Sequence, residues 1–415
     1  MSKFDINLHE AIYSLSDALD LVGVKHIHHG KHVAFMAAEC GKTLGWRGTR
    51  MNELFQAAML HDCGVSKTAE HSRLAQFDLE NAHIHCRIGA ALLKTSPLIA
   101  NLAPIVRHHH THWSQLKNMD LTLDAKLSAN CIYLVDRVDM LTLAFLQGNQ
   151  SNLLLGRNYI RDKILAKRGE WFHAELVDAF MEISKSEAFW LSLEHEHVHG
   201  YVSQWLSGTS TQETEFEQLR SLVRIFSYVV DAKSPFTKAH SDGVARLARL
   251  LGSLLDFSEE SCDMLELAGL LHDIGKLRQP DDLLHKAGKL TDDERALIQR
   301  HSFDTYTILK NIHGLETITE WAAQHHERVD GSGYPYHLEN NSISLGARIV
   351  AVADVFQALA QQRPYRAPLD PDEIMEILNE MVDDGKLDRS VVMCADQNLA
   401  SCWKSAIGIP NTTMQ

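Results

Sequence analysis

Histidine and aspartate recur in one fixed order in each half of this 415-residue chain, which contains 25 His. In the second half the order is His240, His272-Asp273, His301, His325-His326 and Asp354. In the first half it is His29, His61-Asp62, His85, His109-His110 and Asp136. Neutral imidazoles and carboxylates are the usual protein ligands of Fe, Mn, Ni and Zn. The pattern predicts that each half gathers these side chains around metal ions.

The spacing of these residues indicates an internal duplication. The first His precedes the His-Asp pair by 32 residues in both halves, and the next His precedes the His pair by 24 residues in both. The other two steps are 29 against 24 and 29 against 27 residues. We therefore expect one helical unit to occur twice. The register within His108–His110 is open, as is the choice of His26, His28 or His29 as first ligand.

The pair His272-Asp273 follows an apolar segment, where an unpaired buried carboxylate would be costly. Alone, such a pair is more often an ordinary hydrogen-bonded pair. Repeated with the other His and Asp residues, it favours a metal site in which the second oxygen of Asp273 bridges to another ion. Two bridged ions form a hydrolytic centre for phosphorus esters. Lys276 is expected beside the scissile phosphate, although a Lys at a helix C-terminus also has this position.

Apolar residues recur at helical spacing through most of the chain, for example at 265–271, 343–359 and 374–381. We therefore predict an all-α protein. The polar stretch 207–215 is the expected linker between two tandem helical domains, 1–206 and 216–415.

Composition excludes several classes of function. The formal net charge of −14 makes duplex nucleic acid a poor partner, so positive charge at a phosphate ester must come from a local source such as metal ions. The first seven residues lack an apolar signal core, and apolar runs are too short for a membrane helix. We expect a cytoplasmic protein without membrane attachment. Seven scattered cysteines are expected to be reduced thiols, namely Cys40, Cys63, Cys86, Cys131, Cys262, Cys394 and Cys402.

The second half resembles the HD-GYP phosphodiesterases over residues 220–390. The motifs that carry the resemblance are HDIGK at 272–276, KLT at 289–291 with Glu294, His301, HHERVDGSGYP at 325–335, DVFQAL at 354–359 and RPYR at 363–366. This family implies a helical HD fold that hydrolyses cyclic dinucleotides with two or three metal ions. The implied metal ligands are His240, His272, Asp273, His301, His325, His326 and Asp354.

The resemblance also assigns roles around the ligands. Asp273 and Lys276 would be catalytic, and Arg363 and Arg366 would bind substrate phosphate together with Lys276. Gly333 and Tyr334 lie in the signature loop expected near the substrate. Members with three ions carry a Glu where this chain has Phe236, so we expect two divalent ions, Fe, Mn, Ni or Mg.

The first half resembles a decayed HD core. Its candidate ligands are His29, His61, Asp62, His85, His109 and Asp136. Val65 stands where the other half has Lys276, and no Gly-Tyr-Pro loop follows His109-His110. We expect metal binding without efficient turnover, with a structural, regulatory or dimer-forming role, and a homodimer is a possible assembly.

The tandem arrangement is similar to that of 3′,3′-cGAMP-specific phosphodiesterases of vibrios. It favours 3′,3′-cGAMP as substrate and linear pApG as product, ending a second-messenger signal. The alternatives are a c-di-GMP phosphodiesterase, a cyclic-dinucleotide sensor without turnover, and another HD-type nucleotidase. His195, His197 and His199 alternate along the chain and are interpreted as surface or interface residues that face different sides of a helix.

Overall fold

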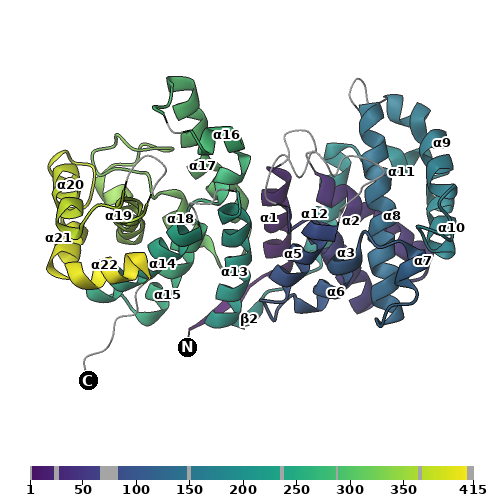
Figure 1. The fold of residues 1–415 in the computed structure, drawn as a ribbon, viewed down its shortest axis with the longest axis horizontal. Coiled ribbons are helices and arrows are strands. Elements are labelled where there is room, and N and C mark those ends of the chain that lie inside the picture. Colours follow the sequence, from purple (N-terminus) through teal and green to yellow (C-terminus); the bar gives the residue numbers. More distant parts are fainter. Residues whose placement is uncertain are drawn as a thin grey trace. The chain divides into compact units, whose positions relative to one another are not determined.

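The chain folds into two compact units in the computed structural model (Figure 1). The structure describes residues 2–22, 28–65, 83–146, 151–233, 238–286, 288–362 and 367–408. The C-terminal unit comprises residues 1–7 and 211–415, and the N-terminal unit comprises residues 8–210. Helices dominate both units, as the periodicity predicts.

The C-terminal unit is built on α14, α15 and α19, which pack against one another. Its elements are β1 (Lys3–Ile6), β2 (Gln212–Glu215), α13 (Phe216–Asp231), α14 (Lys238–Leu254), α15 (Glu259–Leu271), η2 (Ile274–Arg278), α16 (Asp281–Leu284), α17 (Asp292–Leu309), α18 (Glu316–Ala323), η3 (Asn340–Ser342), α19 (Leu345–Ala360), α20 (Pro371–Asp383), α21 (Arg389–Gln397) and α22 (Leu399–Ile407).

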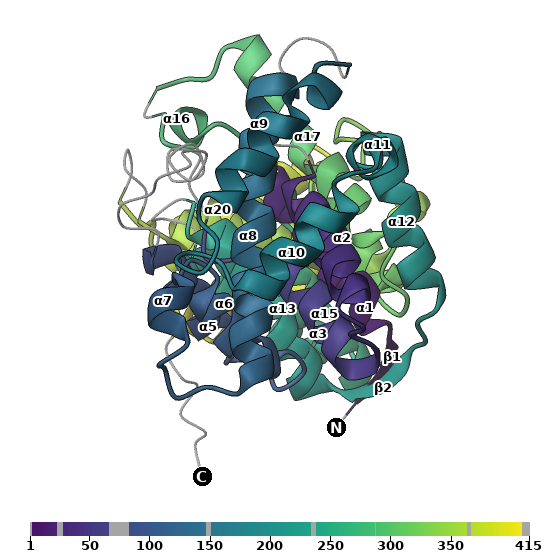
Figure 2. The ribbon, with the colours of Figure 1, turned by 90° about the vertical axis from the view of Figure 1, so that its right-hand side faces the viewer.

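The N-terminal unit is built on α2, α3 and α8, and α10 packs beside α2 and α8 (Figure 2). Its elements are α1 (Leu8–Asp20), α2 (His29–Thr43), α3 (Gly48–Leu60), α5 (His83–Leu93), η1 (Ala100–Leu102), α6 (Ala103–His108), α7 (Trp113–Leu116), α8 (Leu123–Leu146), α9 (Ser151–Leu165), α10 (Ala174–Ile183), α11 (Glu187–Leu191) and α12 (His195–Ser207).

Five helices of one unit correspond in order to five of the other: α14, α15, α17, α18 and α19 correspond to α2, α3, α5, α6 and α8. Each pair carries the same landmark residue at or just beyond its end. The expected duplication is therefore visible in the order of the elements. Local sequence sets where these helices start: the Thr291 hydroxyl accepts from the Glu294 backbone, and the Glu294 carboxylate accepts from the Thr291 backbone, which fixes the start of α17.

A short antiparallel ribbon departs from the all-α expectation. β1 pairs with β2, with Phe4 opposite Thr214. The side chains of Phe4 and Ile6 are buried, so the first strand belongs to the C-terminal unit and not to an N-terminal domain of residues 1–206. Strand pairing across two hundred residues gives no local signal in such short segments.

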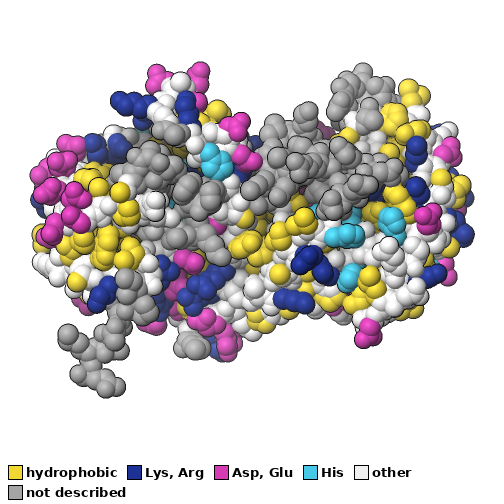
Figure 3. Space-filling view, in the orientation of Figure 1, with side chains coloured by type: hydrophobic (Ala, Val, Ile, Leu, Met, Phe, Trp, Pro, Cys, Tyr) yellow, Lys and Arg dark blue, Asp and Glu magenta, His cyan; other side chains and the backbone are white. Residues whose placement is uncertain are grey.

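The surface agrees with the acidic composition. Asp and Glu side chains gather over α20 and α21, at the edge of the C-terminal unit (Figure 3). Among the residues described, no helix is both long enough and apolar enough to span a membrane.

Candidate metal centres

Five helices bring the predicted ligands of the C-terminal unit together. His240 lies on α14, His301 on α17 and Asp354 on α19, whereas His272-Asp273 and His325-His326 directly follow the ends of α15 and α18. His272 and His301 are fully buried, and His240, Asp273 and His325 are nearly so.

The carboxylate of Asp273 lies between two sets of imidazoles. Its Oδ2 atom is 3.3 Å from Nε2 of His272 and 3.8 Å from Nε2 of His240. Its Oδ1 atom is 3.5 Å from Nε2 of His301 and 4.0 Å from Nε2 of His325. Asp354 joins the first set, with Oδ1 3.1 Å from Nε2 of His240. One carboxylate thus faces two donor sets, the arrangement required of a bridging ligand.

Backbone carbonyls orient the imidazoles. Nδ1 of His272, His301 and His325 lies 2.8, 2.6 and 2.7 Å from the carbonyl oxygen three residues earlier. A carbonyl oxygen only accepts, so each Nδ1 carries the proton and each Nε2 presents its lone pair to the cluster. For His272 and His325, the same bond satisfies a carbonyl at the end of the preceding helix.

His240 is oriented by a residue that the sequence did not indicate. Its Nδ1 lies 2.5 Å from Oε1 of Gln357, one turn beyond Asp354 on α19. Contacts of this kind hold a metal-binding imidazole in place. The signal available in the sequence was the spacing of three residues from Asp354, which puts both side chains on one helix face.

The charges suit a divalent cation. Burial alone would raise the pKa of Asp273, but the imidazole of His272 and the ammonium of Lys276 hold that pKa well below its usual range. Burial lowers the pKa of His301 to about 3 and that of His326 to about 4. At neutral pH, the carboxylate is ionised and these imidazoles are neutral, which are the forms that bind metal.

Unpaired buried atoms show that the residues fit a metal ion. Within the described part of the chain, Nε2 of His272 and Oδ1 of Asp273 are buried without a hydrogen-bond partner. Such atoms are rare because each loses its bond to water. The ammonium of Lys276 contacts Oδ2 of Asp273 at 2.6 Å, so Lys276 lies at the edge of the cluster, as predicted.

The signature loop packs against the ligands. The ring of Tyr334 lies 4.9 Å from the ring of His326, and its backbone donates to the His326 carbonyl at 3.2 Å. Gly333 has no room for a side chain, because a Cβ would stand 2.4 Å from the Arg328 nitrogen and 2.5 Å from the His326 oxygen. Buried Glu327 accepts backbone bonds from the exit of the loop.

A cavity of about 450 Å³ adjoins this loop and the pair His325-His326. Tyr334 lines it together with three cationic side chains, Arg295, Arg328 and Lys386. The sequence did not single out these three cations, because their role depends on elements far apart in the chain. Arg363, Arg366 and Phe236, to which the sequence assigns roles, lie outside the described residues.

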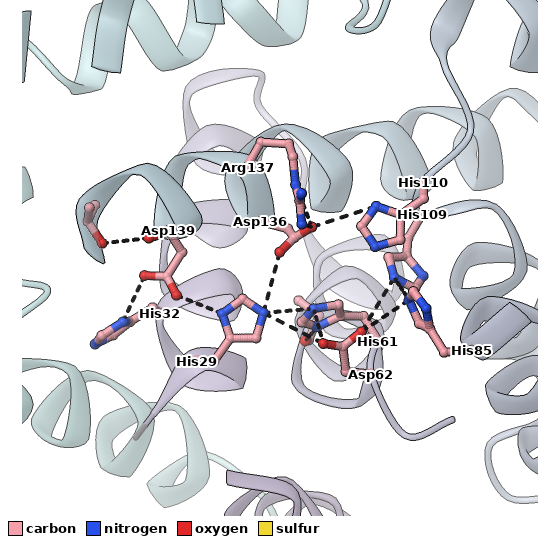
Figure 4. Close-up of polar contacts among 12 residues, drawn as sticks. His29, His32, His61, Asp62, His85, His109, His110, Asp136, Arg137 and Asp139 are labelled. Atoms are coloured by element: carbon pink, nitrogen blue, oxygen red, sulfur yellow. Dashed lines mark hydrogen bonds and ion pairs between the residues drawn. The ribbon is translucent and has the colours of Figure 1, made fainter. Parts of the chain in front are cut away.

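The N-terminal unit repeats the cluster (Figure 4). Oδ1 of Asp62 lies 3.3 Å from Nε2 of His85 and 3.7 Å from Nε2 of His109. Its Oδ2 lies 3.6 Å from Nε2 of His61 and 3.9 Å from Nε2 of His29. Asp136 faces His29, with Oδ1 3.4 Å from Nε2. All six predicted residues meet, and the bridging position of Asp273 is taken by Asp62.

The two clusters differ around this shared arrangement. Arg137 pairs with Asp136 at 2.8 Å, whereas Val355 holds the corresponding position in the C-terminal unit. His29 is oriented by the carboxylate of Asp139 at 2.6 Å. The cavity beside His29 and Asp62 has a volume of about 20 Å³, room for roughly one water molecule.

One interpretation from the sequence is wrong. His195 and His199 do not face different sides of their helix: they are four residues apart on α12, and both rings pack against His28. The three rings each offer a nitrogen, and these nitrogens lie within 4.8 Å of one another. His197, the intervening residue, is exposed.

Comparisons with known proteins agree with this site. A family model described as HD domain matches residues 224–391, and another described as HD domain matches residues 27–141. The chain is 38% identical over 393 residues to 3′3′-cGAMP-specific phosphodiesterase 1 of Vibrio cholerae, which covers 94% of this chain and 91% of that protein. It is 41% identical over 162 residues to the cyclic di-GMP phosphodiesterase response regulator RpfG of Xanthomonas campestris, covering 39% and 42% of the two chains.

A solved structure shares the fold. The cyclic GMP-AMP specific phosphodiesterase V-cGAP3 of V. cholerae has a TM-score of 0.63 at 23% identity, covering 96% of this chain and 98% of that one. The paired His-Asp clusters and the match along nearly the whole chain show that the protein belongs to the HD-domain family of cyclic-dinucleotide phosphodiesterases.

Proposed function

We propose that the C-terminal unit hydrolyses 3′,3′-cGAMP to linear pApG and thereby ends a second-messenger signal. The observation that carries the proposal is the carboxylate of Asp273, which faces two sets of neutral imidazoles and contacts Lys276 beside a cavity lined by cations. The matching region of the N-terminal unit lacks the ammonium, because Val65 stands in its place.

Two divalent ions, Fe, Mn, Ni or Mg, would be held by the seven predicted ligands of this unit. Bound there, they supply Lewis acidity and an activated water for attack on phosphorus. The ligands are His240, His272, Asp273, His301, His325, His326 and Asp354.

The remaining side chains bind and orient the phosphodiester. Water adds to phosphorus, the bond to the 3′ oxygen breaks, and that oxygen takes a proton, leaving a 5′-phosphate and a 3′-hydroxyl. The ammonium of Lys276 stabilises the negative charge that develops on the phosphoryl oxygens. Gly333 allows the loop to lie against the ligand turn, and Tyr334 offers a ring beside His326 for a base to approach. Arg363 and Arg366 are proposed to hold the second phosphate.

Similarity along nearly the whole chain favours 3′,3′-cGAMP over c-di-GMP. The relative matched over 94% of this chain is named for 3′3′-cGAMP, whereas RpfG, named for cyclic di-GMP, matches only 39%. Because a match restricted to one unit carries the chemistry without the tandem arrangement, it is the weaker guide to substrate choice.

Product analysis tests the proposal. Purified full-length protein with added Mn²⁺ is incubated with 3′,3′-cGAMP and with c-di-GMP, and the products are separated by chromatography. We expect pApG to form faster than the linear product of c-di-GMP. Faster cleavage of c-di-GMP would reverse the substrate assignment, and tight binding of either compound without cleavage would identify a sensor.

For the N-terminal unit we propose metal binding without turnover. Three of its departures from the C-terminal unit support this: Val65 in place of the catalytic Lys, Arg137 on the carboxylate of Asp136, and a cavity of about 20 Å³ beside Asp62. The unit retains the donor atoms but lacks, within its described residues, a cation placed as Lys276 is placed.

A further inference from the structure

A thiol stands beside one donor set of the N-terminal cluster. Sγ of Cys86 lies 3.5 Å from Nε2 of His85 and 3.8 Å from Nε2 of His109. Those two nitrogens are 3.2 Å apart, and Oδ1 of Asp62 lies 3.3 and 3.7 Å from them. Five of the six separations among these four donor atoms are thus between 3.2 and 3.8 Å.

These separations match a tetrahedral zinc site. With zinc–nitrogen and zinc–oxygen bonds of about 2.0–2.1 Å and a zinc–sulfur bond of about 2.3 Å, donor atoms lie roughly 3.3–3.6 Å apart. We propose that Asp62, His85, Cys86 and His109 form a closed, four-ligand zinc site, in which Cys86 binds as a thiolate. The inference deepens the proposed metal binding of this unit, on which it rests, by adding a ligand and naming the metal.

Burial and orientation support the assignment. Cys86 and His109 are fully buried and His85 nearly so, which excludes water from the set. Nδ1 of His109 donates to the Val106 carbonyl at 2.7 Å, so its Nε2 faces the other three donors. Within the described residues, Oδ1 of Asp62 is buried without a hydrogen-bond partner. A cation at the centre of the set would satisfy it.

The C-terminal unit shows what the thiol changes. Ser302 follows His301 as Cys86 follows His85, and its hydroxyl lies 3.4 Å from Nε2 of His301. A neutral hydroxyl is a weak ligand beside a thiolate, so this set has three strong protein donors and one position open to water and substrate. Structural zinc sites are closed by four protein ligands, whereas catalytic sites keep a position open. One side chain therefore separates the two roles.

The second donor set of the N-terminal unit is less suited to an ion. The guanidinium of Arg137 contacts Oδ2 of Asp136 through Nη2 at 2.8 Å and Nε at 3.1 Å, and Arg137 is almost completely buried (Figure 4). A fixed positive charge at this carboxylate opposes a divalent ion beside His29 and His61. The site with Cys86 is thus expected to hold one zinc ion.

Cobalt spectroscopy of the full-length protein tests the thiolate ligand. Co²⁺ is exchanged into the protein, and the near-ultraviolet band of thiolate-to-cobalt charge transfer is recorded. We expect the band in the wild-type protein, its loss in Cys86→Ala and its retention in Cys63→Ala, which removes a buried thiol of the same unit. Bound zinc should fall by about one ion per chain in Cys86→Ala alone.

Two further variants keep the result decisive if Cys86→Ala fails to fold. Cys86→His should retain zinc but lose the charge-transfer band, and Ser302→Cys should gain a second band from the C-terminal unit. A wild-type cobalt protein without the band, or the same band in Cys86→Ala, would overturn the inference. Hydrolysis of 3′,3′-cGAMP is measured in parallel: continued turnover without a thiolate band refutes the zinc site and leaves the proposed function standing.

Discussion

The backbone oxygen of His301 lies 2.0 Å from the point where a Cβ on Gly275 would stand. The turn after His272-Asp273 is therefore pressed directly onto the helix that carries the next ligand. Gly64 meets the carbonyl oxygen of His85 in the same way, at 2.1 Å. In both units a missing side chain sets the distance between the His-Asp pair and the third ligand.

Gly275→Ala should separate these ligands. Since the added methyl group meets backbone atoms that cannot rotate away, η2 and α17 must move apart, and His301 moves away from Asp273. Loss of contacts that merely orient ligands costs roughly 10–100-fold in metal affinity or activity, so we expect at least that loss in turnover. Gly288→Ala is the matched control, because its Cβ would meet nothing closer than 4.0 Å. Equal activity of the two variants would contradict this account of Gly275.

Sequence spacing predicted the ligands well because helices have a fixed period. The steps of 32 and 24 residues placed His240, His272 and His301 on successive helices that the structure brings together. The contact of Gln357 with His240 spans 117 residues and depends on how α14 packs on α19, which spacing does not specify.

Two other features escaped the sequence for the same reason. Cys86 was interpreted as an ordinary buried thiol, since a lone Cys beside a His is common. The pairing of β1 with β2 was missed because four-residue strands carry little pattern. Both features depend on contacts made only after the chain has folded.

The two His-Asp pairs should differ in their effect on turnover. His272→Ala or Asp273→Ala removes a donor from the proposed catalytic centre, so hydrolysis of 3′,3′-cGAMP should fall at least roughly a hundredfold. The double variant His61→Ala with Asp62→Ala should keep most of the activity, because the N-terminal unit lacks Lys276. Initial rates with Mn²⁺ in excess measure the difference. Equal losses in the two units would show that both take part in the chemistry.

Lys276→Met should reduce the chemical step without removing metal. The ammonium contacts Asp273 and is proposed to stabilise charge on the phosphoryl oxygens, a kind of contribution worth roughly 10²–10³ in kcat. Metal content and KM should change much less than kcat. Lys310→Met, at an exposed Lys on the surface, is the control. A loss of bound metal equal to the loss of kcat would instead assign Lys276 a role in holding the centre together.

Asp231 should make the stability of the C-terminal unit depend on pH. This carboxyl accepts a hydrogen bond from Ser241 at 2.9 Å, and burial, aided by the charge of Asp273, raises its pKa from 3.8 to about 7. Between these values the unfolded chain is ionised at this position whereas the folded chain holds the proton. Stability contributed by the protonated group is full below pH 3.8 and is lost as pH rises through 7, by about 4 kcal/mol.

Asp231→Asn removes this titration while keeping an oxygen for Ser241. Its unfolding free energy relative to wild type should rise between pH 4.5 and 7.5, in urea titrations followed by circular dichroism, by up to about 4 kcal/mol. Asp242→Asn, at a more exposed carboxyl on α14, should show no comparable rise. A difference between Asp231→Asn and wild type that is constant across this range would mean that the folded protein ionises Asp231 as readily as the unfolded chain does, because its burial is offset by the two serine hydroxyls.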